Sequence, residues 1–246
     1  MSQETVTKSD FAYKILRRDI LEARLAPKSP LKLGVIRETY GLGWTPLREA
    51  LSRLEAEHLV QSTANKGYVV APVSREEMAD LTKTKDIIEL QLLREAMEFG
   101  DQEWEAGIVA AHYRLSREVS PLENIRDLET FIAWTHLHDT FHSSLMAANR
   151  SPWLSRFYDQ VRDHMRRHVR ALRALLPHSE PDAFFDALKK SPALETAYSL
   201  APHTALMEAV INRRFVEATE LMIHHNELTM RAYTEVEQLV HGEKLP

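Results

Sequence analysis

Residues 45–60 read TPLREALSRLEAEHLV, and this stretch decides how the N-terminal part of the chain is interpreted. Thr45 is a good N-cap, and Pro46 suits the first turn of a helix, where its missing N–H leaves no bond unmade. The apolar side chains recur at helical spacing and form one stripe: Leu47, Ala50, Leu51 and Leu54. The polar residues, Arg48 among them, fall on the other faces. The stretch therefore predicts an amphipathic helix whose polar side faces solvent.

Two helices are expected before this one. Residues 9–25 have the apolar spacing of a helix, which Pro27 is expected to end. A short second helix fits residues 33–40, with Gly41 as its C-terminal stop. Two short helices joined by a turn that contains glycine are the outline of a helix-turn-helix.

A β-hairpin is expected directly after the third helix. Residues 60–63 and 68–70 have the alternation of two strands, and residues 64–67 form the turn between them. A helix-turn-helix followed by a hairpin is a winged helix, whose second short helix meets base edges in the major groove. Arg48 is the candidate for reading a guanine, because its guanidinium matches the O6 and N7 acceptors. The pattern alone leaves a small helical bundle with a hairpin as the alternative.

Composition and charge agree with a helix-rich globular protein. The 246 residues are 44% hydrophobic and 27% charged and include only 7 glycines. The chain has no cysteine, which excludes disulfides and thiolate metal ligands. Residues 1–75 hold 12 of the 31 basic and 8 of the 36 acidic residues, so they carry a net +4 while the remainder carries −9. A basic N-terminal part suits an approach to phosphates.

Neither a membrane span nor a secretion signal is expected. No apolar run approaches the roughly 18–20 residues of a membrane-spanning helix. The N-terminal residues MSQETVTKSD lack the apolar core of a signal peptide. We therefore expect a cytoplasmic protein.

Residues 72–77 form a short polar linker, and the pattern beyond it is helical nearly throughout. Breaks at prolines and glycines divide this part into six or seven helices, without a convincing strand. The expected fold class is mainly α. It consists of a winged helix-turn-helix in residues 1–76 and an all-helical bundle in residues 77–246.

Three of the expected helices carry histidine on an apolar face. His138 and His142 lie one turn apart on one helix, and His203 shares an apolar stripe on a second. In the doublet of the third helix, His225 faces inward and His224 faces the polar side. The other histidines of this part are expected to be solvated: His112, His136, His164, His168, His178 and His241. From the pattern alone, the inward histidines are either satisfied core residues or ligands of a metal.

Residues 9–71 resemble the winged-helix domain of the GntR family of bacterial transcription regulators. The resemblance is carried by TPLREALSRLEAEHLV and by KGYVV at residues 66–70. The sequence departs from the family at Gly43-Trp44, where Ser-Arg is common, so the operator sequence of other members does not transfer. The residues expected to contact double-stranded operator DNA are Arg37, Thr45, Arg48, Lys66 and Gly67.

Residues 78–235 resemble the all-helical FCD effector domain of the FadR-type branch of this family. The matching features are FHSSL at residues 141–145, NRSP at residues 149–152, and His203, followed 22 residues later by His225. In that family, three histidines and an aspartate four residues before the first of them bind a divalent metal. Here the aspartate position is His138. The resemblance therefore implies the ligand set His138, His142, His203 and His225, with Asp139 as the alternative to His138.

Together these features predict a DNA-binding transcriptional regulator, and not an enzyme. It is expected to act as a homodimer on a palindromic operator, as a repressor or an activator. The metal is expected to be Zn²⁺ or Ni²⁺, which imidazoles suit. A small carboxylate effector is expected to bind the metal and to pair with an arginine, for which the candidates are Arg94, Arg166 and Arg170.

Two other interpretations stay open. In one, the same regulator has a metal-free effector pocket and the histidines are structural. In the other, the histidines form the centre of a metal-dependent hydrolase. The sequence offers no HExxH or comparable acid–base arrangement beside the histidines, and a hydrolase leaves the DNA-binding pattern unexplained.

Overall fold

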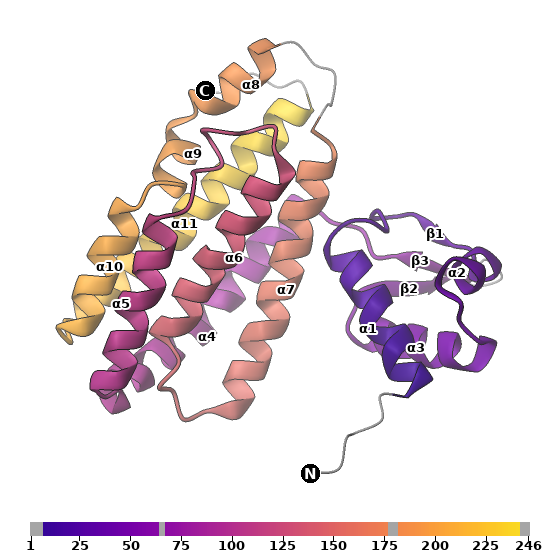
Figure 1. Cartoon of the computed structure of the whole chain (residues 1–246), viewed down its shortest axis with the longest axis horizontal. Coiled ribbons are helices and arrows are strands. Elements are labelled where there is room, and N and C mark those ends of the chain that lie inside the picture. Colours follow the sequence, from indigo (N-terminus) through magenta and orange to yellow (C-terminus); the bar gives the residue numbers. More distant parts are fainter. Residues whose placement is uncertain (1–6, 64–66, 177–181, 242–246) are drawn as a thin grey trace. The chain divides into compact units, whose positions relative to one another are not determined.

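The structure is a computed structural model, and it describes residues 7–63, 67–176 and 182–241 (Figure 1). The chain forms two compact units, and each is described by itself. The first comprises Met1–Met78 and Asp163–Leu175, and the second comprises Ala79–Arg162 and Leu176–Pro246. Helix α7, at Pro152–Ala174, therefore contributes its first part to the second unit and the rest to the first.

The first unit contains three short helices and a small antiparallel sheet. Helices α1, α2 and α3 span Lys8–Leu21, Leu33–Tyr40 and Trp44–Ala56. The strands are β1 at Pro30–Leu31, β2 at Val60–Thr63 and β3 at Gly67–Val70, in the order β1-β3-β2. The stripe of α3 lies in a core shared with α1 and the sheet, which includes Leu16, Leu51 and Val70. The winged helix-turn-helix predicted from the sequence is confirmed.

Details of this unit differ from the sequence prediction at the helix ends. Helix α3 begins at Trp44, and its N-cap is Gly43 in extended conformation. The expectation that Thr45 caps this helix is therefore wrong, and Thr45 lies exposed in the first turn. Helix α1 ends at Leu21, well before Pro27, because Ala23 takes a left-handed conformation with φ 56°. The two-residue strand β1 was not predicted, because two residues are too few to show the alternation of apolar and polar side chains that indicates a strand.

The wing follows the predicted hairpin. Strands β2 and β3 are antiparallel, with Val60 opposite Val70 and Thr63 opposite Gly67. Of the predicted wing tip, Asn65 and Lys66 lie outside the described residues, and Gly67 is exposed with φ 83°. A glycine suits that left-handed position because it has no Cβ.

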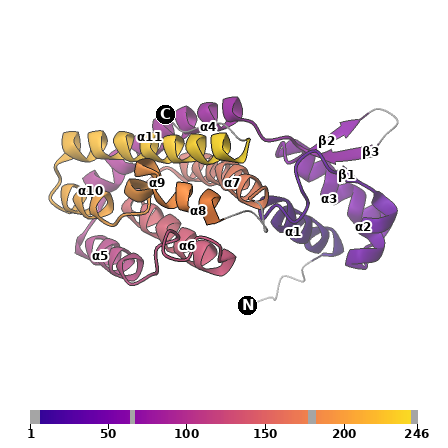
Figure 2. The ribbon, with the colours of Figure 1, turned by 90° about the horizontal axis from the view of Figure 1, so that it is seen from above.

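The second unit is a bundle of helices without strands among its described residues (Figure 2). Besides α7 its helices are α4 at Arg75–Phe99, α5 at Gln102–Ser116, α6 at Leu128–Leu145, α8 at Asp182–Lys189, α9 at Pro192–Ala197, α10 at Ala201–Ile211 and α11 at Phe215–Val240. Helix α5 packs against α6 and α10, while α9 and α10 pack against α11. The main core includes Ile108, Phe141, Leu206 and Met222. None of the described helices combines the length and hydropathy that crossing a membrane requires.

The bundle differs from the sequence prediction in two places. It has eight helices in the described ranges where six or seven were expected; α10 and α11, which were expected as separate helices, are divided at Arg213, whose φ is 56°. Helix α4 begins at Arg75, inside the predicted linker. There the Ser74 hydroxyl accepts a hydrogen bond from the backbone N–H of Glu77 at 3.1 Å, as an N-cap does.

The left-handed residue that ends α2 gives a test of the helix-turn-helix geometry. Gly41 has φ 63°, and a Cβ there meets nothing within 4 Å, so a side chain is disfavoured by the backbone conformation alone. We predict that Gly41→Ala lowers the free energy of unfolding by about 1 kcal/mol. Gly34→Ala is the control: Gly34 lies within α2 with equal space around it and no positive φ, so alanine is expected to raise stability by about 0.5 kcal/mol. Urea unfolding of the full chain measures both, and equal effects would contradict the prediction.

Candidate metal centre and DNA-binding face

The exposed side of α3 carries two of the five residues predicted to meet DNA, Thr45 and Arg48. The buried stripe of α3 faces the core, while Thr45 and Arg48 are exposed in its first two turns. Arg37 of α2 lies with its guanidinium carbon 5.0 Å from the centre of the Trp44 ring, so the aromatic side chain at the family's arginine position is in contact with a cation. The first turns of α3 thus present polar and cationic groups to solvent, as a helix that enters a major groove must.

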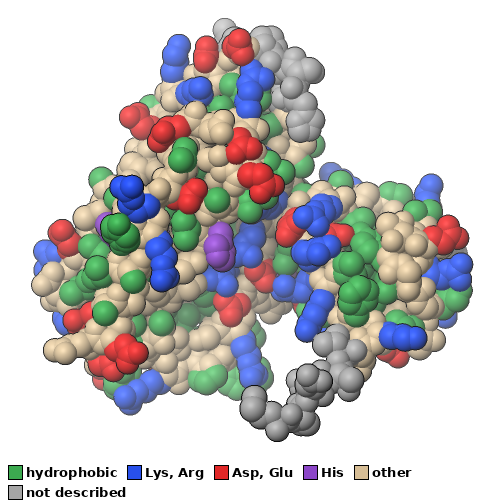
Figure 3. Space-filling model, viewed as in Figure 1, with side chains coloured by type: hydrophobic (Ala, Val, Ile, Leu, Met, Phe, Trp, Pro, Cys, Tyr) green, Lys and Arg blue, Asp and Glu red, His purple; other side chains and the backbone are tan. Residues whose placement is uncertain are grey.

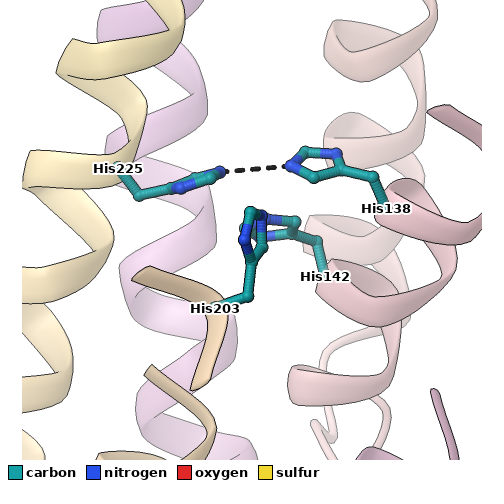
Figure 4. Close-up of side chains that lie close together, drawn as sticks. All are labelled: His138, His142, His203 and His225. Atoms are coloured by element: carbon teal, nitrogen blue, oxygen red, sulfur yellow. Dashed lines mark hydrogen bonds between the residues drawn. The ribbon is translucent and has the colours of Figure 1, made fainter. Parts of the chain in front are cut away.

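Four histidines of the second unit come together in its interior (Figure 4). Helix α6 contributes His138 and His142, α10 contributes His203, and α11 contributes His225. One ring nitrogen from each lies within 4.8 Å of the others. The cluster thus brings together every histidine that the helical phase had selected. His224 is exposed, as predicted for the other member of the doublet.

The four side chains are largely withdrawn from solvent. His142 and His225 are 4% exposed and His203 is 0% exposed, while His138 is partly exposed and stacks on the Trp134 ring at 4.8 Å. On the face seen in Figure 3, only small areas of histidine reach the surface. Buried imidazoles need partners for their ring nitrogens, because an unpartnered buried polar atom costs about 1–3 kcal/mol.

Several of these nitrogens have no hydrogen-bond partner among the described residues. They are both ring nitrogens of His142 and Nε2 of His203. The other nitrogen of His203, Nδ1, lies 2.9 Å from the carbonyl oxygen of Ser199 and donates to it. Nε2 of His203 is therefore left with its lone pair, which is the form that binds a metal. Nε2 of His138 and Nε2 of His225 lie 3.2 Å apart.

Burial keeps three of the four imidazoles neutral. The pKa of His203 is lowered to about 3 by burial, with a smaller contribution from the neighbouring His138. Burial also lowers the pKa of His142 and of His225 well below the usual value, with a smaller contribution from the other rings of the cluster. Neutral imidazole is the ligand form, so the donor set fits a divalent metal that prefers nitrogen. The arrangement can therefore hold such an ion.

Asp139, the alternative to His138, is placed differently. A carboxylate oxygen of Asp139 lies 3.8 Å from Nδ1 of His138, whereas His138 uses Nε2 toward His225. The group of residues gathered closely enough to hold one ion includes His138 and does not include Asp139 among the described residues.

A polar network on α4, α7 and α11 lies beside the histidines, and the sequence reading missed it. The residues are Lys85, Glu89, Tyr158 and Asn226. The sequence of α4 did contain an indication of this network. Leu92 and Ala96 lie on one apolar face, and helical spacing places Glu89 and Lys85 on the same face. In the structure Glu89 is 0% exposed, so its carboxylate is a buried polar group that the sequence could have flagged.

The three arginines predicted to bind an effector lie on α4 and α7. Arg94 is exposed, with its guanidinium carbon 5.8 Å from the centre of the Phe215 ring. Arg166 and Arg170 lie on the part of α7 that belongs to the first unit. The cation that acts electrostatically on His142 and His225 is Lys85.

Of the histidines expected to be solvated, some are not. His136 and His241 are exposed as predicted, and His178 lies outside the described residues. His112 is half-buried, with Nε2 2.9 Å from the Thr204 hydroxyl. The expectation was wrong for His164 and His168, which are 7% and 0% exposed. The basic composition of α7 suggested a solvent-exposed face. Within the first unit, however, His168 is buried and its Nε2 lies 3.0 Å from a carboxylate oxygen of Glu77.

Comparison with known proteins agrees with this architecture. Residues 8–70 match the family described as bacterial regulatory proteins of the gntR family, and residues 80–228 match the FCD domain. The chain is 31% identical over 224 residues to the HTH-type transcriptional repressor GlaR of Escherichia coli K12, covering 90% of this chain and 93% of GlaR. It is 32% identical over 216 residues to BphR of Paraburkholderia xenovorans LB400, named an uncharacterized HTH-type transcriptional regulator, covering 87% and 80% of the two chains.

Solved structures show the same fold at lower identity. Escherichia coli McbR/YncC superimposes with a TM-score of 0.68 at 16% identity, covering 94% of this chain and 99% of that chain. A GntR regulator from Rhodococcus sp. RHA1 gives a TM-score of 0.60 at 16% identity, covering 97% and 99%. The winged helix and the helical bundle define a DNA-binding transcriptional regulator. The chain belongs to the GntR family and has its FCD-type C-terminal domain.

Proposed function

We propose that this regulator is a homodimeric, cytoplasmic repressor whose affinity for a palindromic operator is set by a small carboxylate bound at a metal centre. The observation that carries the proposal is the buried four-histidine cluster in a chain that also has a winged helix. Repression is supported by the name of GlaR, a repressor that shares most of its length with this chain. A dimer is supported by the pairing of half-sites in helix-turn-helix operators.

The DNA contacts assigned in this proposal are those of Arg37, Thr45, Arg48, Lys66 and Gly67. Arg48 reads base edges, because it is exposed near the start of α3 and its guanidinium can donate two hydrogen bonds to one guanine. Phosphate contacts are assigned to Thr45 in the first turn of α3 and to the two other cationic residues, Arg37 and Lys66. Such contacts give affinity without sequence preference.

The metal ligands assigned are His138, His142, His203 and His225, and the ion is Zn²⁺ or Ni²⁺. The fit rests on four converging imidazoles, on the partnerless nitrogens of His142 and His203, and on the absence of cysteine from the sequence. When bound, the ion supplies positive charge and coordination positions that a carboxylate can occupy. The residues of the chain orient the donors, exclude water and surround the effector.

Arg48 gives a test of DNA reading. We predict that Arg48→Ala weakens binding to a specific operator about 5–150-fold, which corresponds to the roughly 1–3 kcal/mol of one bidentate arginine–guanine contact. The matched control is Lys14→Ala, which removes an exposed cation from α1 rather than α3. Duplexes selected by the wild-type protein from a random pool provide the operator, and a mobility-shift titration measures affinity. Equal affinities for the Arg48 variant and wild type would remove Arg48 from the interface.

The histidine doublet of α11 gives a test of the metal centre. We predict that His225→Ala lowers affinity for Zn²⁺ or Ni²⁺ more than the roughly 10–100-fold typical of losing a residue that only supports a ligand. His224→Ala makes the same change one residue away on the exposed side and is expected to bind like wild type. Titration against a chelator of known affinity measures both variants. Wild-type protein that takes up neither ion would leave the metal-free effector pocket as the better interpretation.

The effector gives the third test. Metal-loaded protein on its operator is titrated with small monocarboxylates and dicarboxylates and, as controls, with their amides. We predict that at least one carboxylate changes operator affinity 5–150-fold, the range of a typical coupling free energy of 1–3 kcal/mol, and that its amide does not. The effect is expected to vanish in His225→Ala and after chelation. A carboxylate that acts equally on chelated protein would contradict the role of the metal.

A further inference from the structure

The buried carboxylate of Glu89 lies behind one of the histidines. Glu89 is on α4 and is 0% exposed, and its oxygen Oε1 is 4.0 Å from Nδ1 of His142. His142 is the residue of the cluster whose two ring nitrogens both lack a hydrogen-bond partner among the described residues. A buried acceptor therefore faces a buried nitrogen that has none.

The hydrogen bonds of Glu89 hold this acceptor in place. Oε2 accepts from Nζ of Lys85 at 2.6 Å and from Nδ2 of Asn226 at 2.8 Å. Oε1 accepts from the hydroxyl of Tyr158 at 3.0 Å. Three donors on α4, α7 and α11 thus occupy three of the four lone-pair sites of the carboxylate. The remaining site is on Oε1, the oxygen nearest to His142.

The partners of Glu89 are themselves satisfied. Asn226 also donates through Nδ2 to a carboxylate oxygen of Asp86 at 2.7 Å, and its own oxygen accepts from Lys85 at 2.7 Å. Burial raises the pKa of Tyr158 well above its usual value, so its hydroxyl keeps the proton that it donates. The network is therefore ordered, and the unused acceptor site on Oε1 of Glu89 faces His142.

Stability alone does not account for this arrangement. A buried ion pair such as Lys85–Glu89 contributes little net stability, because the cost of desolvating both charges offsets their attraction. Apolar residues of similar size would fill the same space between α4 and α11. A charged group that is retained next to a candidate ligand points to a role in the ligand's geometry.

A second histidine of the cluster shows what that role is. In His203, the backbone carbonyl of Ser199 takes the Nδ1 hydrogen and leaves the Nε2 lone pair toward the cluster. We infer that Glu89 is the positioning residue for His142: it accepts the Nδ1 hydrogen and thereby directs the Nε2 lone pair at the other three imidazoles. The inference rests on the proposed metal centre. Because coordination at Nε2 makes Nδ1–H a stronger donor, the contact is expected to shorten from 4.0 Å in the metal-bound protein.

Glu89→Gln tests the assignment with little change of shape. The variant is expected to bind Zn²⁺ about 10–100-fold more weakly than wild type, the usual effect of removing the acceptor behind a metal-bound histidine. The matched control is Glu98→Gln, an exposed carboxylate on the same helix, which is expected to leave the affinity unchanged. Chelator competition measures the affinities, and the melting temperature of the metal-free variant is recorded alongside.

A measurement on the wild-type protein keeps the inference testable if Glu89→Gln fails to fold. In Zn²⁺-loaded protein with ¹⁵N-labelled histidine, the two-bond ¹H–¹⁵N spectrum reports which ring nitrogen carries the hydrogen. His142 is expected to carry it on Nδ1. A hydrogen on Nε2 would overturn the inference.

The outcomes separate this inference from the proposed function. Wild-type protein that binds no metal overturns the metal centre and the role of Glu89 with it. Wild-type protein that binds metal, with Glu89→Gln binding within twofold of it, overturns the role of Glu89 alone. That second result includes the case where Glu89→Gln melts at a lower temperature without metal and keeps its affinity, which is the mark of a purely structural residue.

Discussion

The second unit depends on one constraint: imidazole nitrogens that are removed from water must find partners. Three of the four clustered histidines are almost fully buried, and Nε2 of His203 and both nitrogens of His142 have no hydrogen-bond partner in the described part of the chain. A core built for stability alone would put leucine or phenylalanine at these positions. Helices α6, α10 and α11 instead bring one ring nitrogen from each histidine close together, an arrangement that can hold a cation.

The surroundings of the cluster follow from the same constraint. Each imidazole needs an acceptor for its second nitrogen, and the structure places one near each of three rings. His203 has a backbone carbonyl, His142 faces the carboxylate of Glu89, and His138 has the carboxylate of Asp139 at 3.8 Å. Asp139 thus lies near Nδ1 of His138, whereas Nε2 of the same ring is directed at His225.

Much of this could be predicted from the sequence, because helical phase is a local property. The stripe of α3 and the inward orientation of His225 but not His224 follow from a repeat of 3.6 residues, and Gly41 ends α2 as expected. What could not be predicted depends on partners distant in sequence. Glu89 and Asn226 are 137 residues apart, and nothing local indicates that they meet. The N-cap at Gly43 was missed because a helix can start two residues earlier without any change in its apolar stripe.

Helix α7 is hydrogen-bonded to residues that lie around the histidine cluster. Tyr158 of α7 donates to Glu89, and Arg162 of α7 donates to the hydroxyl of Ser143, the residue after His142. From Asp163 onward the same helix belongs to the first unit. Coupling between two sites needs an element that both can bias. On the side of the cluster, the hydrogen bonds of Tyr158 and Arg162 make α7 such an element for the effector response proposed above.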